Sequence, residues 1–174
     1  MRRVGFLCFL SGKRGRRLRP SVTLNEFQSV TRRMAAVSEA ATMLSSVPFF
    51  ASLDGKRRKA LASDGKELLY KAGDPVVGEG ASGVGFYLIL DGHVEVRKGN
   101  RILASLGKGE FFGEMSLIDD QPRSADVIAV TQARCWALSS WSFKALVKAN
   151  PDIALVMLKE LVKRLRAADS SLID

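Results

Sequence analysis

The sequence predicts a mainly β domain with flanking helices, in which eight short strands form a jelly roll or a small barrel. Short apolar segments separated by glycine-rich turns occupy the middle of the chain, which is typical of such folds. Segments with helical spacing of apolar residues precede and follow them. A length of 174 residues and a hydrophobic content of 47% suit one domain with a buried core and tails.

The spacing of small and apolar residues over 22–47 predicts one or two amphipathic helices ahead of the strands. The segment Val47–Leu53 then predicts a turn and a short, compact helical segment packed on the core. A more polar helix is expected around Gly55–Ser63. We therefore expect a helical part over 34–64 and a β-barrel over 65–139.

The strands of the barrel are expected from Lys66 onward, where the apolar period changes to short runs between glycine turns. Gly99-Asn100 predicts a hairpin with a two-residue turn. The expected strands are Glu67–Lys71, Pro75–Gly78, Gly85–Leu90, His93–Lys98, Arg101–Leu106, Glu110–Phe112, Ala125–Val130 and Ala133–Ser139.

Two helices are expected at the end of the domain, over 140–170. Ser139 or Ser140 can cap the first, and Asn150-Pro151 interrupts it. The second helix runs from Pro151 to about Ala168, with proline in its first turn. Its apolar surface is wide, and two interpretations are open: it packs entirely onto its own barrel, or part of it forms a dimer seam. The residues of this surface are Ile153, Val156, Met157, Leu158, Leu161, Val162 and Leu165.

The net charge of +9 is concentrated at the N-terminus. Residues 1–33 hold nine lysines and arginines and one acid, whereas the remaining 141 residues carry 18 basic and 17 acidic groups. We therefore expect a basic, disordered extension over 1–33 and a nearly neutral domain over 34–174, whose own charge does not indicate nucleic-acid binding. Three interpretations of the extension are open: a poor signal peptide, a tail that touches nucleic acid or acidic lipid, and thirdly either a merely disordered extension or a start codon assigned too early, with Met34 as the true start.

Most enzymatic and metal chemistry is excluded by composition. Two cysteines and the single His93 cannot form a four-ligand zinc site or a nucleophile–base pair, and Cys135 fits a small buried hydrophobe. The G-x-G-x-x-G match at 78–83 precedes a strand, so it predicts a turn, and Asp119-Asp120 predicts a solvated turn. No apolar run is long enough to cross a bilayer. We expect a cytoplasmic protein that is not an enzyme and uses no metal or cofactor.

The segment 109–125 holds the candidate binding residues. Gly113 permits a tight turn and a close ligand, and Glu114 can accept a hydrogen bond from a sugar hydroxyl. Arg123 offers a planar fork of donors to two phosphate oxygens. The pattern predicts a ligand with both hydroxyls and a phosphate. Further contacts are expected from the N–H groups of a short helical turn over Met115–Ile118, from the Ser124 hydroxyl, and from the N–H groups of Ser124 and Ala125.

The run Phe112–Leu117, followed by Arg123–Ala125, resembles the phosphate-binding cassette of cyclic nucleotide-binding domains. That family includes the bacterial catabolite activator proteins and the regulatory subunits of cyclic AMP-dependent kinase. The resemblance extends over roughly Leu44–Leu165, with Phe86–Val96 similar to the central hairpin and Asn150–Ile153 similar to the start of the C-terminal helix. It implies an eight-stranded jelly-roll β-barrel with N-terminal helices and a long C-terminal helix.

The resemblance also implies the roles of the residues. Glu114 would bind the ribose 2′-hydroxyl and Arg123 the cyclic phosphate, with Ser124 favouring cyclic AMP over cyclic GMP, since threonine often accompanies cyclic GMP binding in the family. Ligand binding would move Leu117 and Ile118 and re-dock the C-terminal helix, and the output would pass to a partner, through a homodimer or an unknown effector. The implied ligand-binding set is Gly113, Glu114, Met115, Ser116, Arg123, Ser124 and Ala125.

Two departures from the family limit these expectations. The chain ends at Asp174, where DNA-binding relatives continue into a helix-turn-helix, so we expect no direct DNA binding. The helix end Ala167–Ser171 lacks the polar residues that contact adenine in those relatives, which leaves purine recognition open. An alternative is a degenerate domain that acts as a structural or interaction module without ligand, with Arg123 paired to Glu114. Asp126 is a further candidate partner of Arg123 or of a neighbour.

Overall fold

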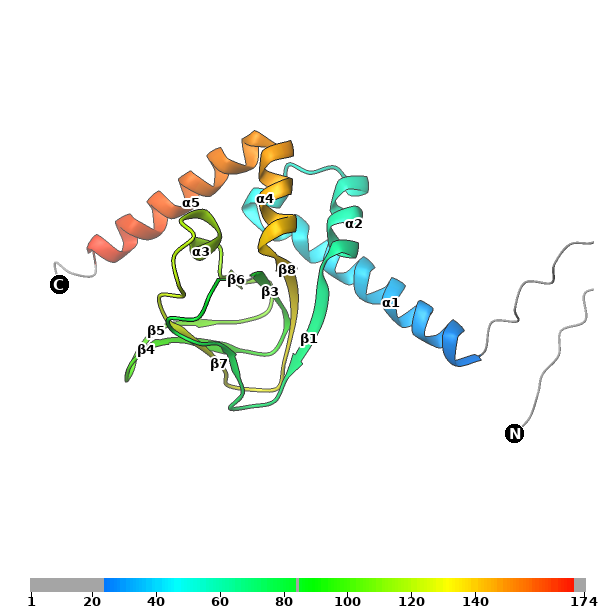
Figure 1. Cartoon of the computed structure of the whole chain (residues 1–174), viewed down its shortest axis with the longest axis horizontal. Helices are drawn as coiled ribbons and strands as arrows, with labels where there is room; N and C mark the ends of the chain where they lie inside the picture. The colour runs from blue at the N-terminus through cyan, green and yellow to red at the C-terminus, as the bar shows by residue number, and fades with distance from the viewer. Residues whose placement is uncertain (1–23, 84, 171–174) are drawn as a thin grey trace, which may run out of the picture.

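Two antiparallel sheets of four strands each form the body of the domain, and helices pack beside them at both ends of the chain (Figure 1). The structure is a computed structural model that describes residues 24–83 and 85–170. Along the sheets, the strand orders are β1-β8-β3-β6 and β2-β7-β4-β5. This is the expected mainly β jelly roll with flanking helices.

The N-terminal helical part contains α1 (Leu24–Met43), two 3₁₀ turns (Leu44–Ser46 and Pro48–Phe50) and α2 (Gly55–Asp64). Asp54 caps α2, because its carboxylate accepts a hydrogen bond from the Arg57 N–H at 2.8 Å. The expected boundary between residues 33 and 34 is corrected here, since α1 runs through it without a break. The rest of the expected extension, 1–23, lies outside the described residues.

The eight expected strands are all present among the described residues, with ends that differ by at most one residue. Lys98 pairs with Arg101, so the β4–β5 hairpin turns at Gly99-Asn100 as predicted. A single helical turn, α3 (Met115–Ile118), lies between β6 and β7. The strands are β1 (Lys66–Tyr70), β2 (Pro75–Val77), β3 (Gly85–Asp91), β4 (Val94–Lys98), β5 (Arg101–Leu106), β6 (Phe111–Phe112), β7 (Asp126–Ala129) and β8 (Ala133–Ser139).

Strand β3 is buried on both faces, which explains its continuous apolar run. Successive side chains of a strand point to opposite faces, so β3 contributes to two hydrophobic clusters. Phe86 and Leu88 join the cluster between this sheet and the helices, together with Phe49 and Trp136. Tyr87 joins the cluster between the two sheets, where its ring stacks on Phe112 at 5.0 Å.

The C-terminal helices are α4 (Ser140–Ala149) and α5 (Pro151–Ser170). The Ser139 hydroxyl caps α4 by accepting from the Ser142 N–H at 3.2 Å. Figure 1 shows α5 leaving the end of α4 and running past α3 and beyond the barrel. Only part of its apolar surface reaches the core: Ile153 and Met157 are buried, whereas Leu155, Leu158, Val162 and Leu165 are exposed. The interpretation that packs the whole helix surface onto the barrel is therefore wrong.

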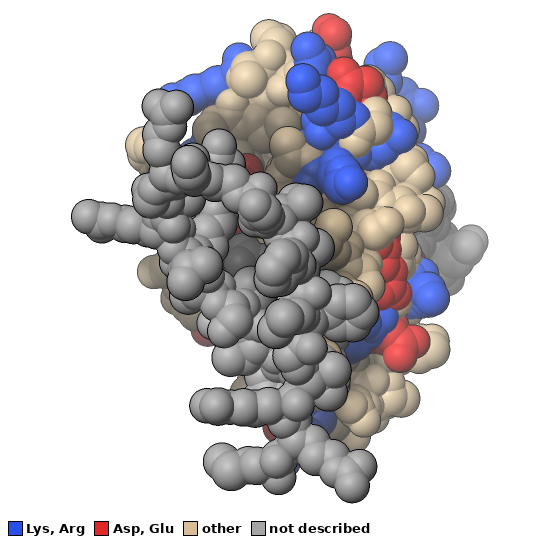
Figure 2. Space-filling model, turned by 90° about the vertical axis from the view of Figure 1, so that its right-hand side faces the viewer, with Lys and Arg blue, Asp and Glu red and all other residues tan. Residues whose placement is uncertain are grey.

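The surface carries local concentrations of positive charge. Lysine and arginine side chains gather near the top of the face shown in Figure 2, at the height that α2 and α4 have in Figure 1. Helix α2 holds four basic residues in its first turns, at positions 56–59. His93 is exposed. No helix within 24–83 and 85–170 combines the length and apolar character needed to span a membrane.

Candidate functional site

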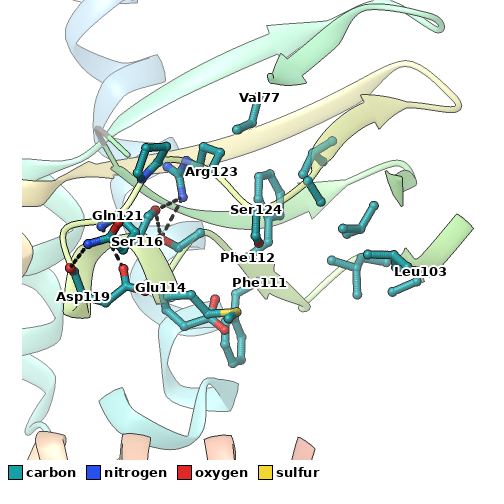
Figure 3. Close-up of a pocket in the computed structure, with 18 of the residues that line it drawn as sticks. Val77, Leu103, Phe111, Phe112, Glu114, Ser116, Asp119, Gln121, Arg123 and Ser124 are labelled. Atoms are coloured by element: carbon teal, nitrogen blue, oxygen red, sulfur yellow. Dashed lines mark hydrogen bonds between the residues drawn. The ribbon is translucent and has the colours of Figure 1, made fainter. Parts of the chain in front are cut away.

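A cavity of about 630 Å³ lies between the sheet β2-β7-β4-β5 and the segment from β6 to the start of β7. Polar side chains lie at one end of it and apolar side chains from the sheet at the other (Figure 3). This volume is in the range of small-molecule sites. The residues that line it are Val77, Val96, Leu103, Ala104, Leu106, Glu110–Ser116, Asp119, Gln121–Ala125 and Val127.

Gly113 ends β6 and turns the chain into the cavity wall. Its φ is +91°, a conformation that side chains with a Cβ rarely adopt. A Cβ at this position would lie 2.6 Å from Nη1 of Arg123 and 2.8 Å from the carbonyl oxygen of Gly85. Both the turn and the approach of Arg123 therefore require glycine here, in agreement with the predicted close approach.

The guanidinium of Arg123 is buried and held by three acceptors. Nη1 donates to the carbonyl oxygen of Gly113 and to the hydroxyl of Ser116, each at 2.8 Å (Figure 3). Nη2 donates to the carbonyl oxygen of Gly85 at 2.5 Å. The guanidinium also lies over the ring of Tyr87, 5.8 Å from its centre. These contacts fix the cation in one orientation at the polar end of the cavity.

Burial lowers the pKa of Arg123 from its ordinary value, while coulombic effects of Tyr87 and Glu114 raise it. An arginine remains charged throughout the physiological range. The carboxylate of Glu114 is itself buried and lines the same cavity. The site therefore brings one cation and one acid together as buried side chains, and both act more strongly on a ligand there than they would at the exposed surface.

The contacts of Arg123 and Asp126 bear on two structural alternatives. The hydrogen-bond acceptors of the Arg123 guanidinium include two backbone carbonyls and a hydroxyl, and, against the lowering by burial, a coulombic effect of Glu114 raises the pKa of Arg123. Asp126 instead accepts from the N–H of Glu79, at 2.7 Å. That bond attaches the start of β7 to the loop after β2.

The glycine-rich loop at 78–83 is a turn between β2 and β3, as predicted, and it supports the site. The N–H of Gly80 donates to the carbonyl oxygen of Arg123, and the N–H of Arg123 donates to the carbonyl oxygen of Ala81, both at 2.8 Å. Gly83 approaches α3 so closely that a Cβ would lie 2.3 Å from the hydroxyl oxygen of Ser116. This role was not predicted from the sequence, because the pairing joins residues far apart along the chain.

The other expected ligand-binding residues also reach the cavity. Met115, Ser124 and Ala125 line it, with Met115 and Ser124 exposed and Ala125 buried. Ser116 is buried beneath them as the partner of Arg123. The structure thus brings all seven expected residues to one cavity, and their part in binding remains a prediction.

Leu117 and Ile118 face a different hollow. They line a groove of about 360 Å³ that α3 forms with α4 and α5. Leu117 is 2% exposed and belongs to the core cluster beneath the helices, whereas Ile118 is 50% exposed. The helical turn α3 therefore has the cavity of about 630 Å³ on one side and the C-terminal helices on the other.

The apolar end of the cavity was missed in the sequence. Val77, Val96, Leu103 and Val127 come from all four strands of one sheet and line this end. The sequence gives only a weak indication of this wall, because a partly exposed leucine such as Leu103 is indistinguishable from an ordinary surface residue of an edge strand. Only the pairing order of the strands shows that these side chains share one wall.

The acidic turn after α3 is structural. Asp119 accepts a hydrogen bond from the N–H of Gln121 at 3.0 Å, and Asp120, whose φ is +58°, forms an ion pair with Lys144. Among the residues that the structure describes, no group of three or more histidine, cysteine or acidic side chains is placed to hold a metal ion. The prediction of a solvated turn is confirmed, since both aspartates are exposed.

Comparison with known proteins gives consistent matches. Residues 67–150 match the family described as "Cyclic nucleotide-binding domain". A cGMP-dependent protein kinase of Plasmodium berghei is 35% identical over 122 residues, which cover 70% of this chain and 14% of that protein. A cAMP-dependent protein kinase regulatory subunit of Aspergillus fumigatus is 37% identical over 112 residues, covering 63% and 27%. The chain thus spans less than a third of the length of these curated relatives.

The same similarity is found in three dimensions. The crystal structure of the Thermus thermophilus catabolite activator protein superposes with a TM-score of 0.65 at 36% identity, over 72% of this chain and 61% of that one.

Proposed function

Since residues 67–150 form a domain of the cyclic nucleotide-binding family, we propose that the cavity binds a cyclic nucleotide, cyclic AMP in preference to cyclic GMP. We propose a regulatory role for the domain rather than a catalytic one. The observation that carries the proposal is that buried Arg123 and buried Glu114 both line the polar end of a cavity whose other end is apolar. A cyclic nucleotide has the same sequence of parts: phosphate, ribose and base.

The phosphate is assigned to Arg123. Its guanidinium carries five N–H donors, of which three have acceptors within the described residues. The cation therefore retains donors for a phosphate while the protein holds its plane in place, and a charge-assisted hydrogen bond of this kind is about twice as strong as a neutral one. The N–H groups of Ser124 and Ala125 and the Ser124 hydroxyl are assigned as neutral donors to the same phosphate.

The ribose and base are assigned to the rest of the cavity. Glu114 is an acceptor when ionised, which suits the ribose 2′-hydroxyl. Val96 and Leu103 offer an apolar surface to a purine at the other end. The preference for cyclic AMP rests on Ser124, because threonine at this position often accompanies cyclic GMP binding in the family.

Binding is coupled to the C-terminal helices through α3. One side of this turn lines the nucleotide cavity with Met115 and Ser116, and the other side lines the groove beneath α5 with Leu117 and Ile118. A phosphate that draws Arg123 inward also acts on Ser116 through their hydrogen bond, and so on α3. The nucleotide shifts the position of α5 only to the extent that it binds one position better than the other.

The output is assigned to a partner that contacts α5, either a second copy of the chain or an effector protein. A ligand-free module is not favoured. Arg123 and Glu114 are polar side chains buried at the wall of an open cavity, and their burial carries a desolvation penalty that a charged and hydroxylated ligand would offset.

A thermal denaturation experiment tests the proposal. The full chain is heated with cyclic AMP, with cyclic GMP and with 5′-AMP, which has the same base but no cyclic phosphate. A ligand at 100 times its dissociation constant stabilises the folded state by about 2.7 kcal/mol. We expect the largest rise in Tm with cyclic AMP and the smallest with 5′-AMP. Equal Tm values with and without each cyclic nucleotide at millimolar concentration would exclude the proposal.

A further inference from the structure

The outer face of α5 carries an exposed apolar stripe. Leu155, Leu158, Val162 and Leu165 are between 48% and 61% exposed. Their spacing alternates between three and four residues, which is the a and d pattern of a helix that packs against another helix. A helix that only needed to pack on its own barrel would not repeat this pattern on the face turned away from the barrel.

The stripe is continuous with the groove beneath α5. Leu158 belongs to both, since it also lines the hollow of about 360 Å³ between α3, α4 and α5. From the groove the apolar surface passes through Leu158 to Leu155 and Val162 on the outside. The result is a continuous apolar strip that runs from the groove along α5.

Positive charges border this strip on both sides. Lys159, Lys163 and Arg166 follow its outer edge on α5, and Lys144 and Lys148 follow its inner edge on α4. Among the described residues that line the two hollows, Asp120 is the single acid, and it forms an ion pair with Lys144. A partner on this strip therefore meets a net positive rim, which favours acidic side chains at its own edges.

We propose that this strip binds an amphipathic helix of a partner protein, with an apolar seam flanked by acidic residues. The proposal rests on the function proposed above and identifies the chemistry of the effector. Because Leu117 and Ile118 form part of the groove, a movement of α3 changes the surface on which the partner helix lies. The partner thereby senses the state of the nucleotide cavity.

Other occupants fit the charges less well. In a two-stranded contact through the stripe, Lys159 and Arg166 occupy the positions next to the seam, and the chain places Ala154 and Leu161 at the opposing flank. In a parallel contact a second copy therefore offers no acidic residue to these cations, and in an antiparallel contact its own Lys159 and Arg166 outnumber the single acid Asp152 at the same flank. The segment 1–23 of the same chain is also unsuitable, because it holds seven basic residues and no acid.

Synthetic peptides test the proposal on the full chain. The probe is a fluorescent helical peptide of three heptads with leucine at a and d and glutamate at e and g. Its matched control has lysine at e and g, and a second control has the glutamate sequence in scrambled order. By fluorescence anisotropy we expect the glutamate peptide to bind at least about tenfold more tightly than either control, with an affinity that falls as salt rises.

Charge reversal provides the decisive variant. The double variant Lys159→Glu/Lys163→Glu should invert the preference, so that the lysine peptide binds more tightly than the glutamate peptide. The control Lys71→Glu/Lys98→Glu reverses two exposed lysines on the barrel and should leave the preference unchanged. Both variants should keep the cyclic AMP-dependent rise in Tm, which separates a failure of this proposal from a failure of the proposed nucleotide binding.

Three outcomes would overturn the proposal. Equal affinity for the glutamate and lysine peptides would show that the rim does not select its partner by charge. A dimer in light scattering that is lost in Leu158→Asp would assign the strip to a second copy. Cosedimentation of the chain with phosphatidylserine vesicles, lost in the lysine-to-glutamate variant, would assign it to an anionic membrane surface.

Discussion

Nη1 of Arg123 donates a hydrogen bond to the hydroxyl oxygen of Ser116, at 2.8 Å, in the interior of the segment that forms the candidate site. This bond joins the short helix α3 to the loop that precedes β7, seven residues further along the chain. It fixes the plane of the cation and at the same time attaches the cation to the element that borders the groove beneath α5. Ser116 is therefore a positioning residue for the cation assigned to the phosphate.

Replacing Ser116 by alanine should lower the free energy of unfolding by roughly 1–3 kcal/mol, because it removes an acceptor from a buried charged donor. Cyclic AMP affinity should fall as well, since the guanidinium loses one of its fixed contacts. Urea denaturation and calorimetric titration measure the two effects. Ser63→Ala is the matched control: that hydroxyl donates to the carbonyl oxygen of Lys59 on the exposed side of α2, so stability should change by less than about 0.5 kcal/mol. Equal effects of the two substitutions would argue against a positioning role.

Gly113→Ala should be destabilising and should also impair binding. The positive φ adds strain of about 1–3 kcal/mol, and the new Cβ meets Arg123 and the backbone of β3. Gly73→Ala separates the two effects, since Gly73 has nearly the same φ, +90°, and no atom within 4 Å of its Cβ position. We expect a loss of cyclic AMP affinity for Gly113→Ala alone, measured by calorimetry. A similar loss of affinity for both variants would mean that backbone strain, and not displacement of Arg123, is responsible.

The coupling role of α3 is tested at two neighbouring residues. Leu117→Ala removes a core side chain and should lower the free energy of unfolding by about 2–5 kcal/mol, whereas Ile118→Ala removes one that is half exposed and should have a smaller effect. In the wild-type chain, cyclic AMP should change amide hydrogen exchange in α5. Leu117→Ala should reduce that change more than Ile118→Ala does. A full response of α5 in both variants would exclude coupling through these side chains.

The free energy of unfolding should decrease in alkaline solution because burial raises the pKa values of Cys135 and Tyr70. Burial raises the pKa of Cys135 from its ordinary value of 9.0 to about 11. Burial, with smaller effects of Tyr87 and Cys135, raises the pKa of Tyr70 from 10.0 to about 12. Both groups are neutral when protonated, and the unfolded chain loses these protons at lower pH than the folded one. Their contribution is therefore fully present below about pH 9 and is lost as pH rises through 11 and 12.

Urea denaturation of the wild type, Cys135→Ala and Tyr70→Phe at about pH 8 and about pH 11 measures this contribution. Each variant lacks one of the titrating groups, so its free energy of unfolding should decrease less between the two pH values than that of the wild type. The comparison uses the change with pH and not the stability itself, because Cys135→Ala also removes a buried sulfur atom. Identical pH dependences in all three proteins would refute the assignment.

The sequence predicted the strands because each is a local pattern. β3 shows this most clearly: its apolar run is set by burial on both faces, and the glycine turns on each side limit its length. The polar end of the candidate site was equally accessible, since Gly113, Glu114 and Arg123 are close together in the chain. The hairpin at Gly99-Asn100 and the cap at Ser139 were also predicted, because turn and cap residues act on their nearest neighbours.

Features that depend on distant pairing were not predicted. The apolar wall with Val77 and Leu103 exists only because β2 and β5 are the two edges of one sheet. The reciprocal backbone bonds that join the 78–83 loop to Arg123 follow from the same arrangement. The spacing of apolar residues predicts a helix that begins before residue 34, whereas the cluster of basic residues assigns the same residues to a disordered extension. Helix α1 begins at Leu24, so the apolar spacing was the better guide there.

Calorimetric titration of cyclic AMP into the wild type and into Arg123→Ala tests the central claim most directly. Arg134→Ala is the control, because Arg134 makes surface ion pairs with Glu39 and Glu67 away from the cavity. Arg123→Lys serves if the alanine variant does not fold, since it keeps the charge but not the fork of donors. We predict saturable binding to the wild type and to Arg134→Ala, and a loss of roughly 2–5 kcal/mol of binding free energy in Arg123→Ala. Wild-type affinity in both Arg123 variants, or no binding heat in the wild type at millimolar nucleotide, would contradict the assignment of this cavity to a cyclic nucleotide.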